Sequence, residues 1–401
     1  MKTPPLQLAE AQVRLLALAP RLPVEHRSVG ECLGQFLAEP LLARRTQPAA
    51  PLSAMDGYAL RSSDAPGPWK VIGESAAGRP FSGVIGIGEA ARISTGAIVP
   101  QGADTVVLQE DAQRDGDKVS VNADAILHAP RHIRPLGMDF AEHDELIAAG
   151  TRIGPAQIAL AIAAGHAHLP VHRRVKLTVI DSGDELVPPG QTTAHHQLPA
   201  SNGPMLCAMA ASLPVDIRHV GPVADQLGAL TAALENAEDA DVIVTSGGAS
   251  VGDHDLVRPS LMAIGASLDF WRVAIKPGKP LLVATRGQQL VLGLPGNPAS
   301  AFVTAHLFML PLLRAASGAA VPLPQPLQSV LATPMPKGGG RTEFLRGYWN
   351  GNQVTLDSLQ DSGALSPLAR ANVLVLREAG APARTVGDRV SIYLLENGGF
   401  A

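Results

Sequence analysis

The sequence is poor in cysteine, in aromatic residues and in net charge. Only two cysteines, Cys32 and Cys207, occur in 401 residues, which fits a reducing compartment, leaves one isolated disulfide as an alternative, and excludes a metal site built from several thiolates. Phenylalanine, tryptophan and tyrosine together make up 3% of the chain, too few for a surface on which nucleic-acid bases stack. The formal net charge of -4 gives no general attraction to nucleic acid or to an anionic membrane. An anionic ligand would therefore have to be captured by local geometry.

Long apolar runs are missing as well. The N-terminus lacks the apolar core of a signal peptide, and the apolar segments 158–164 and 301–313 are too short or too interrupted to span a bilayer. We therefore expect a soluble, cytoplasmic protein. No P-loop sequence occurs, and the histidines do not share a metal-binding spacing beyond the chance pair His168 and His172. Neither an ordinary nucleotide triphosphatase nor a histidine metal site is expected.

The most distinctive stretch runs from Asp241 to Ser300. Residues 242–244 form an apolar β-branched run that is typical of a buried parallel strand. The run opens into a Ser/Gly loop followed by acids. Ligands of open α/β sheets bind at the carboxyl ends of the strands, where glycine lets backbone N–H groups approach an anion. We predict a phosphate or oxyanion pocket here, whose candidate residues are Ser246, Gly247, Gly248, Asp253 and Asp255.

Two lysines belong to the same stretch. Lys276 and Lys279 flank a stiff Pro-Gly pair and would supply positive charge beside the pocket. A further strand, 290–294, leads into a turn from Pro295 to Pro298 that precedes an apolar helix. Acids and lysines that converge on one crevice suit phosphoryl chemistry, in which a metal ion bridges phosphate oxygens and lysine offsets the developing charge.

Three acids follow an earlier predicted strand. Strand 175–180 is followed by Asp181, Asp184 and Glu185, which surround Gly183. Carboxylate oxygens are the ligands that hard cations such as Mg²⁺ prefer, and they also accept hydrogen bonds from the hydroxyl groups of a ligand. The pattern predicts a Mg²⁺ or hydroxyl-binding site at this strand end, with a plain turn as the alternative.

Three polar motifs lie in the N-terminal third of the chain. Asp56 precedes a glycine, Thr95 stands between Ser94 and Gly96, and a loop with charges of both signs ends at Asp139. A hydroxyl beside glycine can bind an oxyanion, but each motif also has an ordinary explanation as a turn or a solvated loop. Their residue types alone therefore assign no function.

The pattern of elements in the first half predicts two domains. Helical patterns occur at 8–19, 28–42 and 154–165. We predict a helical arm made of residues 1–46 and 147–171, with the α/β domain as a second packing partner for the first helix. Short alternating runs bounded by turn residues predict an inserted all-β domain at 47–146.

The second half predicts two further domains. Alternating strands and helices at 172–316 predict a doubly wound, parallel α/β domain, in which Ser201 caps a helix and another helix begins at Asp225. After Pro322 the pattern shows strands without helices, which predicts a small C-terminal β-barrel at 322–401.

Motifs along nearly the whole chain resemble those of one family. In chain order they are Ser53-Ala-Met-Asp-Gly-Tyr-Ala59, Ser94-Thr-Gly-Ala97, Ser182-Gly-Asp-Glu-Leu186, Ser201-Asn-Gly-Pro-Met-Leu206, the stretch 245–255, Lys276-Pro-Gly-Lys-Pro280, Gly293-Leu-Pro-Gly-Asn-Pro298 and Arg341-Thr-Glu-Phe-Leu-Arg346. Any one of them is modest evidence. The ordered set resembles the molybdopterin molybdenumtransferases, the MoeA proteins and the E domain of gephyrin.

This resemblance implies an elongated homodimer whose active site lies between the α/β domain of one subunit and the inserted β domain of the other. It implies an enzyme that inserts molybdenum from molybdate into the dithiolene of adenylylated molybdopterin, assisted by Mg²⁺, and releases AMP. Candidate protein partners are a molybdopterin adenylyltransferase and recipient molybdoenzymes. Nucleic acid and membrane are not expected as partners.

The resemblance also implies roles for individual residues in the α/β domain and the barrel. Glu185, Asp225 and Asp255 would hold Mg²⁺ on the pyrophosphate of the adenylylated pterin. Lys276, together with Arg346, would bind molybdate near the dithiolene.

Residues of the inserted β domain would complete the pocket across the dimer interface; these are Asp56, Thr95 and Asp139. Further substrate-binding positions are Ser246, Gly247, Gly248, Lys279, Pro295, Pro298 and Ser366. The family usually has Gly-Ser-His before the last serine, whereas residues 361–365 of this chain read Asp-Ser-Gly-Ala-Leu.

Two other functions fit parts of the same pattern. A molybdopterin adenylyltransferase resembles residues 172–316 alone, and the additional β domains argue against it. A non-catalytic molybdopterin-binding or scaffold protein could keep the fold without turnover, but acids at every matched position argue against that function.

Overall fold

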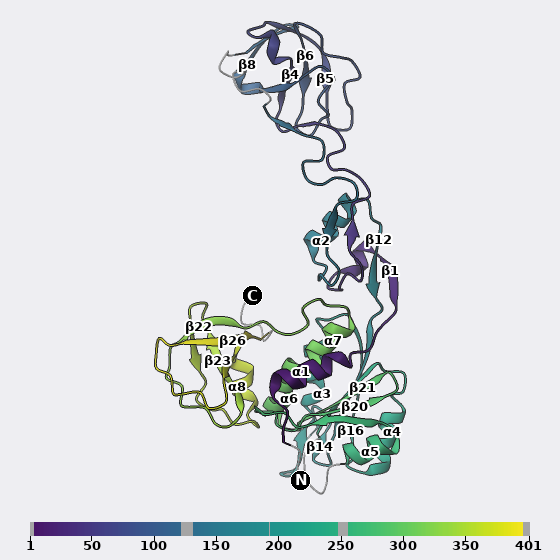
Figure 1. The fold of residues 1–401 in the computed structure, drawn as a ribbon, viewed down its shortest axis with the longest axis vertical. Coiled ribbons are helices and arrows are strands. Elements are labelled where there is room, and N and C mark those ends of the chain that lie inside the picture. The colour runs from purple at the N-terminus through teal and green to yellow at the C-terminus, as the bar shows by residue number, and fades with distance from the viewer. Residues whose placement is uncertain (1–3, 122–130, 192, 248–255, 396–401) are drawn as a thin grey trace.

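The computed structural model describes residues 4–121, 131–191, 193–247 and 256–395. The molecule is elongated, with a small β domain at one end, a narrow arm in the middle, and an α/β domain beside a β-barrel at the other end (Figure 1). The chain passes through the arm twice. On the outward path β1 (Val24–Ser28) pairs antiparallel with β12 (His168–His172) of the return path. The β domain is thus an insertion at the far end of the arm.

The inserted β domain is built on one six-stranded sheet in the order β7-β4-β6-β5-β9-β8. Its strands are β4 (Gly57–Leu60), β5 (Trp69–Ser75), β6 (Glu89–Ile93), β7 (Thr105–Leu108), β8 (Ala112–Asp115) and β9 (Lys118–Val121). Trp69 is fully buried and packs with Leu60 and Val107 in the core. The all-β prediction for this region is confirmed.

The arm contains more strand and less helix than the sequence predicts. The predicted helix at 28–42 is wrong, since this segment forms a 3₁₀ turn at Val29–Cys32 and a short strand, β2 (Leu41–Leu42), paired with β11 (Glu145–Ile147). Gly34 adopts a φ of +79°, which breaks a right-handed helix. The predicted second helix of the arm is confirmed as α2 (Pro155–Ala163).

The first helix belongs to the α/β domain. In α1 (Leu8–Ala17), Ala11 and Leu15 are buried in the same hydrophobic core as Leu307 and Leu313. Figure 1 shows α1 lying across the helices of that domain. Of the two places predicted for this helix, packing on the α/β domain is the one found.

The α/β domain is organised around a six-stranded sheet in the order β16-β13-β17-β21-β20-β18. Four strands run parallel: β16 (Val215–Val223), β13 (Val175–Ser182), β17 (Val242–Ser246) and β21 (Gln289–Leu294). The parallel prediction holds for these four strands. An antiparallel edge follows, because β20 (Leu282–Arg286) forms a hairpin with β21 and β18 (Ser267–Trp271) pairs with β20.

Helices cover both faces of this sheet, so the doubly wound arrangement is confirmed. One face carries α1, α3 (Asn202–Ala210), α6 (Pro298–Thr304) and α7 (Leu310–Ala316), and the other carries α4 (Leu227–Glu235) and α5 (Val257–Ala263). Alternate residues of β17 serve the two cores: Val242 and Val244 pack on the first face and Ile243 on the second.

The apolar helix predicted after Pro298 is found as one long helical stretch. Helices α6 and α7 are joined by a π-helical turn, Ala305–Met309, into a continuous stretch, Pro298–Ala316. Its 19 residues are long and apolar enough to cross a membrane by length and composition alone. In the structure 89% of its most apolar window is buried within the protein, as in the core helix of a globular domain.

The C-terminal domain is a closed five-stranded barrel in the order β23-β24-β22-β26-β25, with β25 returning to β23. Its strands are β22 (Leu327–Leu331), β23 (Thr342–Trp349), β24 (Gln353–Leu356), β25 (Val373–Arg377) and β26 (Arg389–Leu394). The expectation that no helix follows Pro322 is wrong, because α8 (Leu365–Arg370) lies between β24 and β25. The barrel is joined to the α/β domain by β19 (Ile275–Lys276), which pairs parallel with β23.

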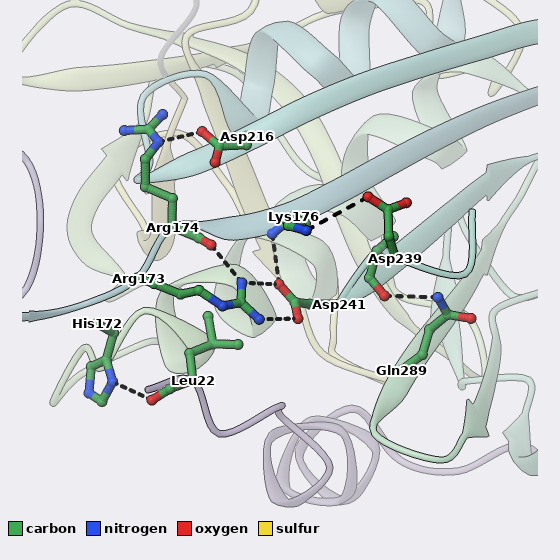
Figure 2. A network of polar contacts seen from close by, with 10 residues as sticks. Leu22, His172, Arg173, Arg174, Lys176, Asp216, Asp239, Asp241 and Gln289 are labelled. Carbon is green, nitrogen blue, oxygen red and sulfur yellow. Dashed lines mark hydrogen bonds and ion pairs between the residues drawn. The ribbon is translucent and has the colours of Figure 1, made fainter. Parts of the chain in front are cut away.

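A charged network lies at the amino ends of the strands, opposite the predicted pocket (Figure 2). The two terminal guanidinium nitrogens of Arg173 donate to the carboxylate of Asp241, each at 2.7 Å, and the backbone N–H of Lys176 donates to the same carboxylate at 2.8 Å. These bonds fix the start of β13 against the start of β17. The network is thus a structural clamp at the end of the sheet where ligands of such folds do not bind.

Candidate active site

Three neighbouring strand ends meet at the carboxyl rim of the sheet. These are Ser182 of β13, Gly247 after β17, and Gly296 after β21. Gly247 has a φ of +97°, and a β-carbon there would lie 2.8 Å from the carbonyl oxygen of Ser182. A β-carbon on Gly296 would lie 3.5 Å from the Cα of Gly247. The predicted Ser/Gly pocket is therefore a close approach of backbone segments that requires glycine at position 247.

Two acidic loops lie side by side at this rim. The backbone N–H of Gly183 donates to Val223 O at 3.1 Å, and that of Asp225 donates to the Asp184 carboxylate at 2.9 Å. The Glu185 carboxylate folds back over Gly183, where a β-carbon would lie 2.6 Å from its Oε2. The structure thus brings together the loops of Glu185 and Asp225, two residues that the family resemblance assigns to one Mg²⁺ site.

Asp181 does not belong to the exposed acidic group. Its side chain is fully buried, and its Oδ2 accepts hydrogen bonds from Gly203 N at 2.9 Å and interacts with His219 Nε2 at 3.0 Å. The expectation that three acids surround Gly183 is therefore corrected to two, Asp184 and Glu185. Asp181 instead holds the first turn of α3 against the sheet.

The first turn of α3 contacts the turn that follows β21. Asn202 Nδ2 donates to Gly296 O at 2.7 Å, and its buried Oδ1 has no partner among the described residues. Pro295 and Pro298 bracket this turn at the entry to α6. Asn202 is a rim residue that sequence reasoning missed, although its motif, residues 201–206, carried part of the family resemblance.

Lys276 is held by the barrel. Its Nζ lies 3.2 Å from Oε1 of Glu343, a residue whose side chain is 4% exposed. The other carboxylate oxygen of Glu343 accepts from Nε of the buried Arg377 and pairs with its terminal nitrogen. More than half of the Lys276 side chain remains exposed. Glu343 is a second residue that sequence reasoning missed.

The lysine turn is packed against α6. Gly278 has a φ of +103°, and a β-carbon there would lie 2.5 Å from Thr304 Cγ2 and 3.6 Å from Ser300 O. The side chain of Lys279 is exposed, while its carbonyl accepts from Val273 N at 3.1 Å. The turn that carries both lysines thus rests on the helix that starts at Pro298.

Arg346, which the resemblance pairs with Lys276, is buried in the barrel domain. Its side chain is 1% exposed, and its terminal nitrogen donates to Leu359 O at 3.0 Å inside the barrel domain. Burial lowers the pKa of its guanidinium below the ordinary value. The environment of Arg346 is that of a residue that stabilises the loop around Leu359.

The predicted Ser366 lies exposed in the first turn of α8. A different serine of the same loop reaches the rim: the Ser362 hydroxyl accepts from Asn297 Nδ2 at 3.1 Å, and its carbonyl accepts from Ala299 N at 3.0 Å. Ser362 lies in the segment where the motif departs from the usual family pattern. The barrel therefore contacts the turn from Pro295 to Pro298 through Ser362.

Asp56 and Thr95 form a pair in the inserted β domain. Asp56 Oδ1 accepts from the Thr95 backbone N–H at 2.7 Å and from the Thr95 hydroxyl at 3.2 Å. The backbone hydrogen bond is the main cause that lowers the pKa of Asp56, so this exposed carboxylate is charged at neutral pH.

The inserted domain lies far from the rim within one chain. Asp139 is exposed where the inserted domain joins the arm, and its backbone N–H donates to Gln47 O at 3.0 Å. Figure 1 shows β4 and β6 at the opposite end of the molecule from β14 (Leu186–Val187) and α3. One chain therefore does not unite Asp56 and Thr95 with Glu185 and Lys276.

Gly248, Asp253 and Asp255 lie outside the described residues. Ser246 is described and is buried at the end of β17. The described part of the rim still offers a glycine-lined approach and the carboxylates of Glu185 and Asp225. Such a set can bind a polyanion together with a hard cation.

Comparison with known proteins agrees with this arrangement along the whole chain. Three family models match in order: the MoeA N-terminal region (domain I and II) at 6–165, a probable molybdopterin binding domain at 178–315, and the MoeA C-terminal region (domain IV) at 328–395. The first match covers α1, the inserted β domain and most of the arm, the second covers most of the α/β domain, and the third covers the barrel.

Named relatives and solved structures extend the comparison. The molybdopterin molybdenumtransferase of Haemophilus influenzae is 30% identical and covers 96% of this chain and 98% of the relative. That of Staphylococcus aureus strain MRSA252 is 29% identical, with coverages of 99% and 97%. A molybdopterin biosynthesis MoeA protein from Pyrococcus horikoshii has 28% identity and a TM-score of 0.82 over 98% of this chain and 99% of that chain. The chain therefore belongs to the MoeA family, whose relatives named here are transferases.

Proposed function

We propose that this protein is a molybdopterin molybdenumtransferase that inserts molybdate into the dithiolene of adenylylated molybdopterin and releases AMP. The observation that carries the proposal is the meeting of Ser182, Gly247 and Gly296 beside two acidic loops at one rim. Matches to the N- and C-terminal regions of MoeA favour this activity over that of an adenylyltransferase.

The pterin and its phosphates would bind along the rim. The Gly247 N–H donates to Leu294 O at 3.2 Å, and the absence of a side chain at this position would let phosphate oxygens approach the strand ends closely. The Oδ1 of Asn202, which has no partner among the described residues, would accept a hydrogen bond from a ring N–H of the pterin. The turn from Pro295 to Pro298, fixed by Asn202 and Ser362, would form the wall of the pocket.

Glu185 and Asp225 would hold Mg²⁺. The hydrogen bond from Asp225 N to Asp184 places the two loops in contact, and carboxylate oxygens suit this ion. Among the described residues no three acidic, histidine or cysteine side chains are already gathered as a metal cluster. Two protein ligands would leave room for Asp255, water and phosphate oxygens. Bound Mg²⁺ would neutralise the charge of the pyrophosphate group.

Lys276 would bind the molybdate dianion. Its ammonium group is exposed on one side and paired with a buried carboxylate on the other, so Glu343 fixes its position while the charge stays available. Lys279, on the same turn, would add positive charge. Arg346 is left out of this role because its guanidinium is buried and bonded to Leu359.

Asp56, Thr95 and Asp139 would complete the pocket from a second subunit. Their separation from the rim within one chain supports a homodimer with shared sites. The test mixes two inactive variants, Asp56→Ala and Glu185→Ala, and measures AMP release. Random pairing makes half of the dimers heterodimers with one intact site each, so activity should recover to about a quarter of wild type.

The matched control uses Asp115→Ala in place of Asp56→Ala. Asp115 is an exposed aspartate of β8 in the same domain. This variant should be active alone. If heterodimers form, as judged by tagged co-purification, and the mixture of Asp56→Ala with Glu185→Ala stays inactive, the shared site is wrong. If wild type itself binds molybdate and adenylylated molybdopterin without releasing AMP, the enzymatic proposal is wrong.

A further inference from the structure

A cavity of about 230 Å³ lies in the C-terminal barrel, where the hairpin of β25 and β26 opens. The register between these two strands ends at the pair Val375 and Ile392. Beyond this pair β25 continues along β23, whereas β26 continues along β22. The loop 378–388 lines the gap between the diverging strands. No residue assigned above to the candidate active site appears among the described residues that line this cavity.

Two arginines bring accessible positive charge to this cavity. Arg389, at the start of β26, is exposed, and its guanidinium makes no hydrogen bond or ion pair with any described residue. Arg384, in the loop, is half-buried, and one of its terminal nitrogens donates to the carbonyl of Arg389. This bond holds the Arg384 side chain beside the start of β26 and occupies one of its donors. Within the described part of the chain, neither arginine has a carboxylate partner.

The other charges on the cavity do not cancel these two. Arg377 also lines it, but this side chain pairs with Glu343 and donates to Pro336 O at 2.7 Å, so its charge and donors are already used. Glu378 is the one acid among the described lining residues, and it is exposed to solvent. Two arginines therefore face one glutamate, and the cavity has a net positive charge that favours an anionic ligand.

A hydroxyl group lies on the same face of β26 as Arg389. Val390 and Ile392 are buried in the barrel core, so the alternation of a strand places Arg389 and Ser391 on the outer face. Gln328 Nε2 donates to Ser391 Oγ at 3.0 Å from the neighbouring strand β22. Because the Ser391 oxygen accepts this bond, its own hydrogen is available to a ligand. The outer face thus adds a neutral donor to the two cations.

We propose that this cavity in the barrel is a binding site for a phosphate group. The guanidinium groups of Arg384 and Arg389 would bind its oxygens, and the Ser391 hydroxyl would donate a third hydrogen bond. Arginine suits this role because its planar fork of donors matches the oxygens of a phosphate. The volume is below the range of sites for drug-sized ligands, which fits a phosphate ion or a small phosphate monoester. The proposal does not depend on the enzymatic activity proposed above.

The test is calorimetric titration of the full-length protein with inorganic phosphate, glycerol 3-phosphate and acetate. Phosphate should bind about tenfold or more tightly than acetate, because it has more charge and more acceptor oxygens. Arg384→Gln and Arg389→Gln should each weaken phosphate about tenfold, as expected for the loss of a charge-assisted hydrogen bond. Lys337→Gln, which removes an exposed cation of the same domain that does not line the cavity, should leave the affinity unchanged. Tighter binding of glycerol 3-phosphate than of phosphate would identify a monoester as the ligand, and the reverse order would identify the free ion; either order supports a phosphate site.

Two further variants test the place of binding. Lys279→Gln removes an exposed charge from the lysine turn near the strand-end rim, so it should weaken phosphate bound at the rim and leave phosphate in the barrel cavity unaffected. Ser391→Trp should fill the cavity from the outer face and abolish phosphate binding without a change of charge. Phosphate should raise the thermal unfolding midpoint of wild type and not that of the double variant Arg384→Gln/Arg389→Gln, while the two ligand-free proteins unfold at similar temperatures.

Three results would overturn the proposal. They are equal affinity for phosphate and acetate, phosphate binding that is lost in Lys279→Gln or survives both the double arginine variant and Ser391→Trp, and no heat of binding at millimolar phosphate in wild type.

Discussion

Lys276 and Glu343 are joined twice. They are direct partners in the parallel pairing of β19 with β23, and Lys276 Nζ lies 3.2 Å from Glu343 Oε1. Because one residue belongs to the α/β domain and the other to the barrel, this contact fixes the lysine turn relative to the second domain. The barrel thus contributes to the candidate site through a buried carboxylate.

Glu343→Gln should lower both stability and molybdate binding. The substitution leaves Arg377 buried without its anionic partner, and breaking a buried pair in this way costs about 3 kcal/mol. It also frees Lys276 from its fixed position, so KM for molybdate should rise more than kcat falls. Urea unfolding and steady-state kinetics measure the two effects.

The control is Asp216→Asn, which breaks the exposed pair of Arg174 and Asp216. It should lower the free energy of unfolding by less than about 1 kcal/mol and leave KM for molybdate unchanged. If Glu343→Gln lowers the free energy of unfolding by no more than Asp216→Asn does, the structural role assigned to the buried pair is wrong.

Gly247→Ala should destabilise the protein and disrupt the rim. A β-carbon at this position meets the Ser182 carbonyl at 2.8 Å and also forces alanine to a φ of +97°. Together these effects should cost about 2–4 kcal/mol. Thermal unfolding and substrate titration provide the measurements.

Two alanine variants separate the causes. Gly265→Ala has a φ of +77° and open space around its β-carbon, so it should report the backbone strain alone. Gly296→Ala meets only an ordinary contact of 3.5 Å and should change stability little. If Gly247→Ala costs no more than Gly265→Ala, the close approach to Ser182 has no energetic importance.

The parts of the fold that could be predicted are those governed by local pattern. Residues 242–244 are buried on both faces, which gives a continuous β-branched run that is easily recognised. The antiparallel edge formed by β18 and β20 has no comparable local signature, because strand direction depends on a hairpin turn and on packing. The helix predicted at 28–42 is wrong for a related reason. The apolar spacing of this segment is that of a helix, while Gly34 adopts a left-handed backbone conformation.

Of the candidate residues, Glu185 could be named from its place after a strand, Asp225 only from the family resemblance, and residues that act through contacts between distant segments were missed. Glu185 and Asp225 follow neighbouring parallel strands, so the sheet itself places their loops together. Glu343 and Ser362 act through contacts with residues far away in the chain, which no local motif reveals. The burial of a charged side chain could not be predicted either, since the sequence did not indicate that Arg346 lies inside the barrel domain.

Asp241→Asn should destabilise the α/β domain without affecting ligand binding. Its carboxylate accepts two bonds from Arg173 and one from Lys176 N, as Figure 2 shows, and the hydrogen bonding to Asp241 raises the pKa of Arg173. Loss of these charge-assisted bonds should cost about 2–3 kcal/mol in urea unfolding. Asp239→Asn, which affects only long, exposed pairs at 3.8 Å, should cost less than about 0.5 kcal/mol. A higher KM in Asp241→Asn would show that this network acts on the rim.

His306 should make stability depend on pH. Burial, with a smaller effect of Arg314, lowers the pKa of this imidazole to about 4, whereas the unfolded chain has the ordinary value of about 6.5. The unfolded state therefore binds a proton that the folded state does not between these two values, so stability is complete above pH 6.5 and falls as the pH drops toward 4. The free energy of unfolding should fall by about 3 kcal/mol in total over this range. Urea unfolding of wild type and His306→Phe over this range measures it. The phenylalanine variant should show a shallower decline, and parallel curves for the two proteins would mean that His306 does not titrate differently in the folded and unfolded states.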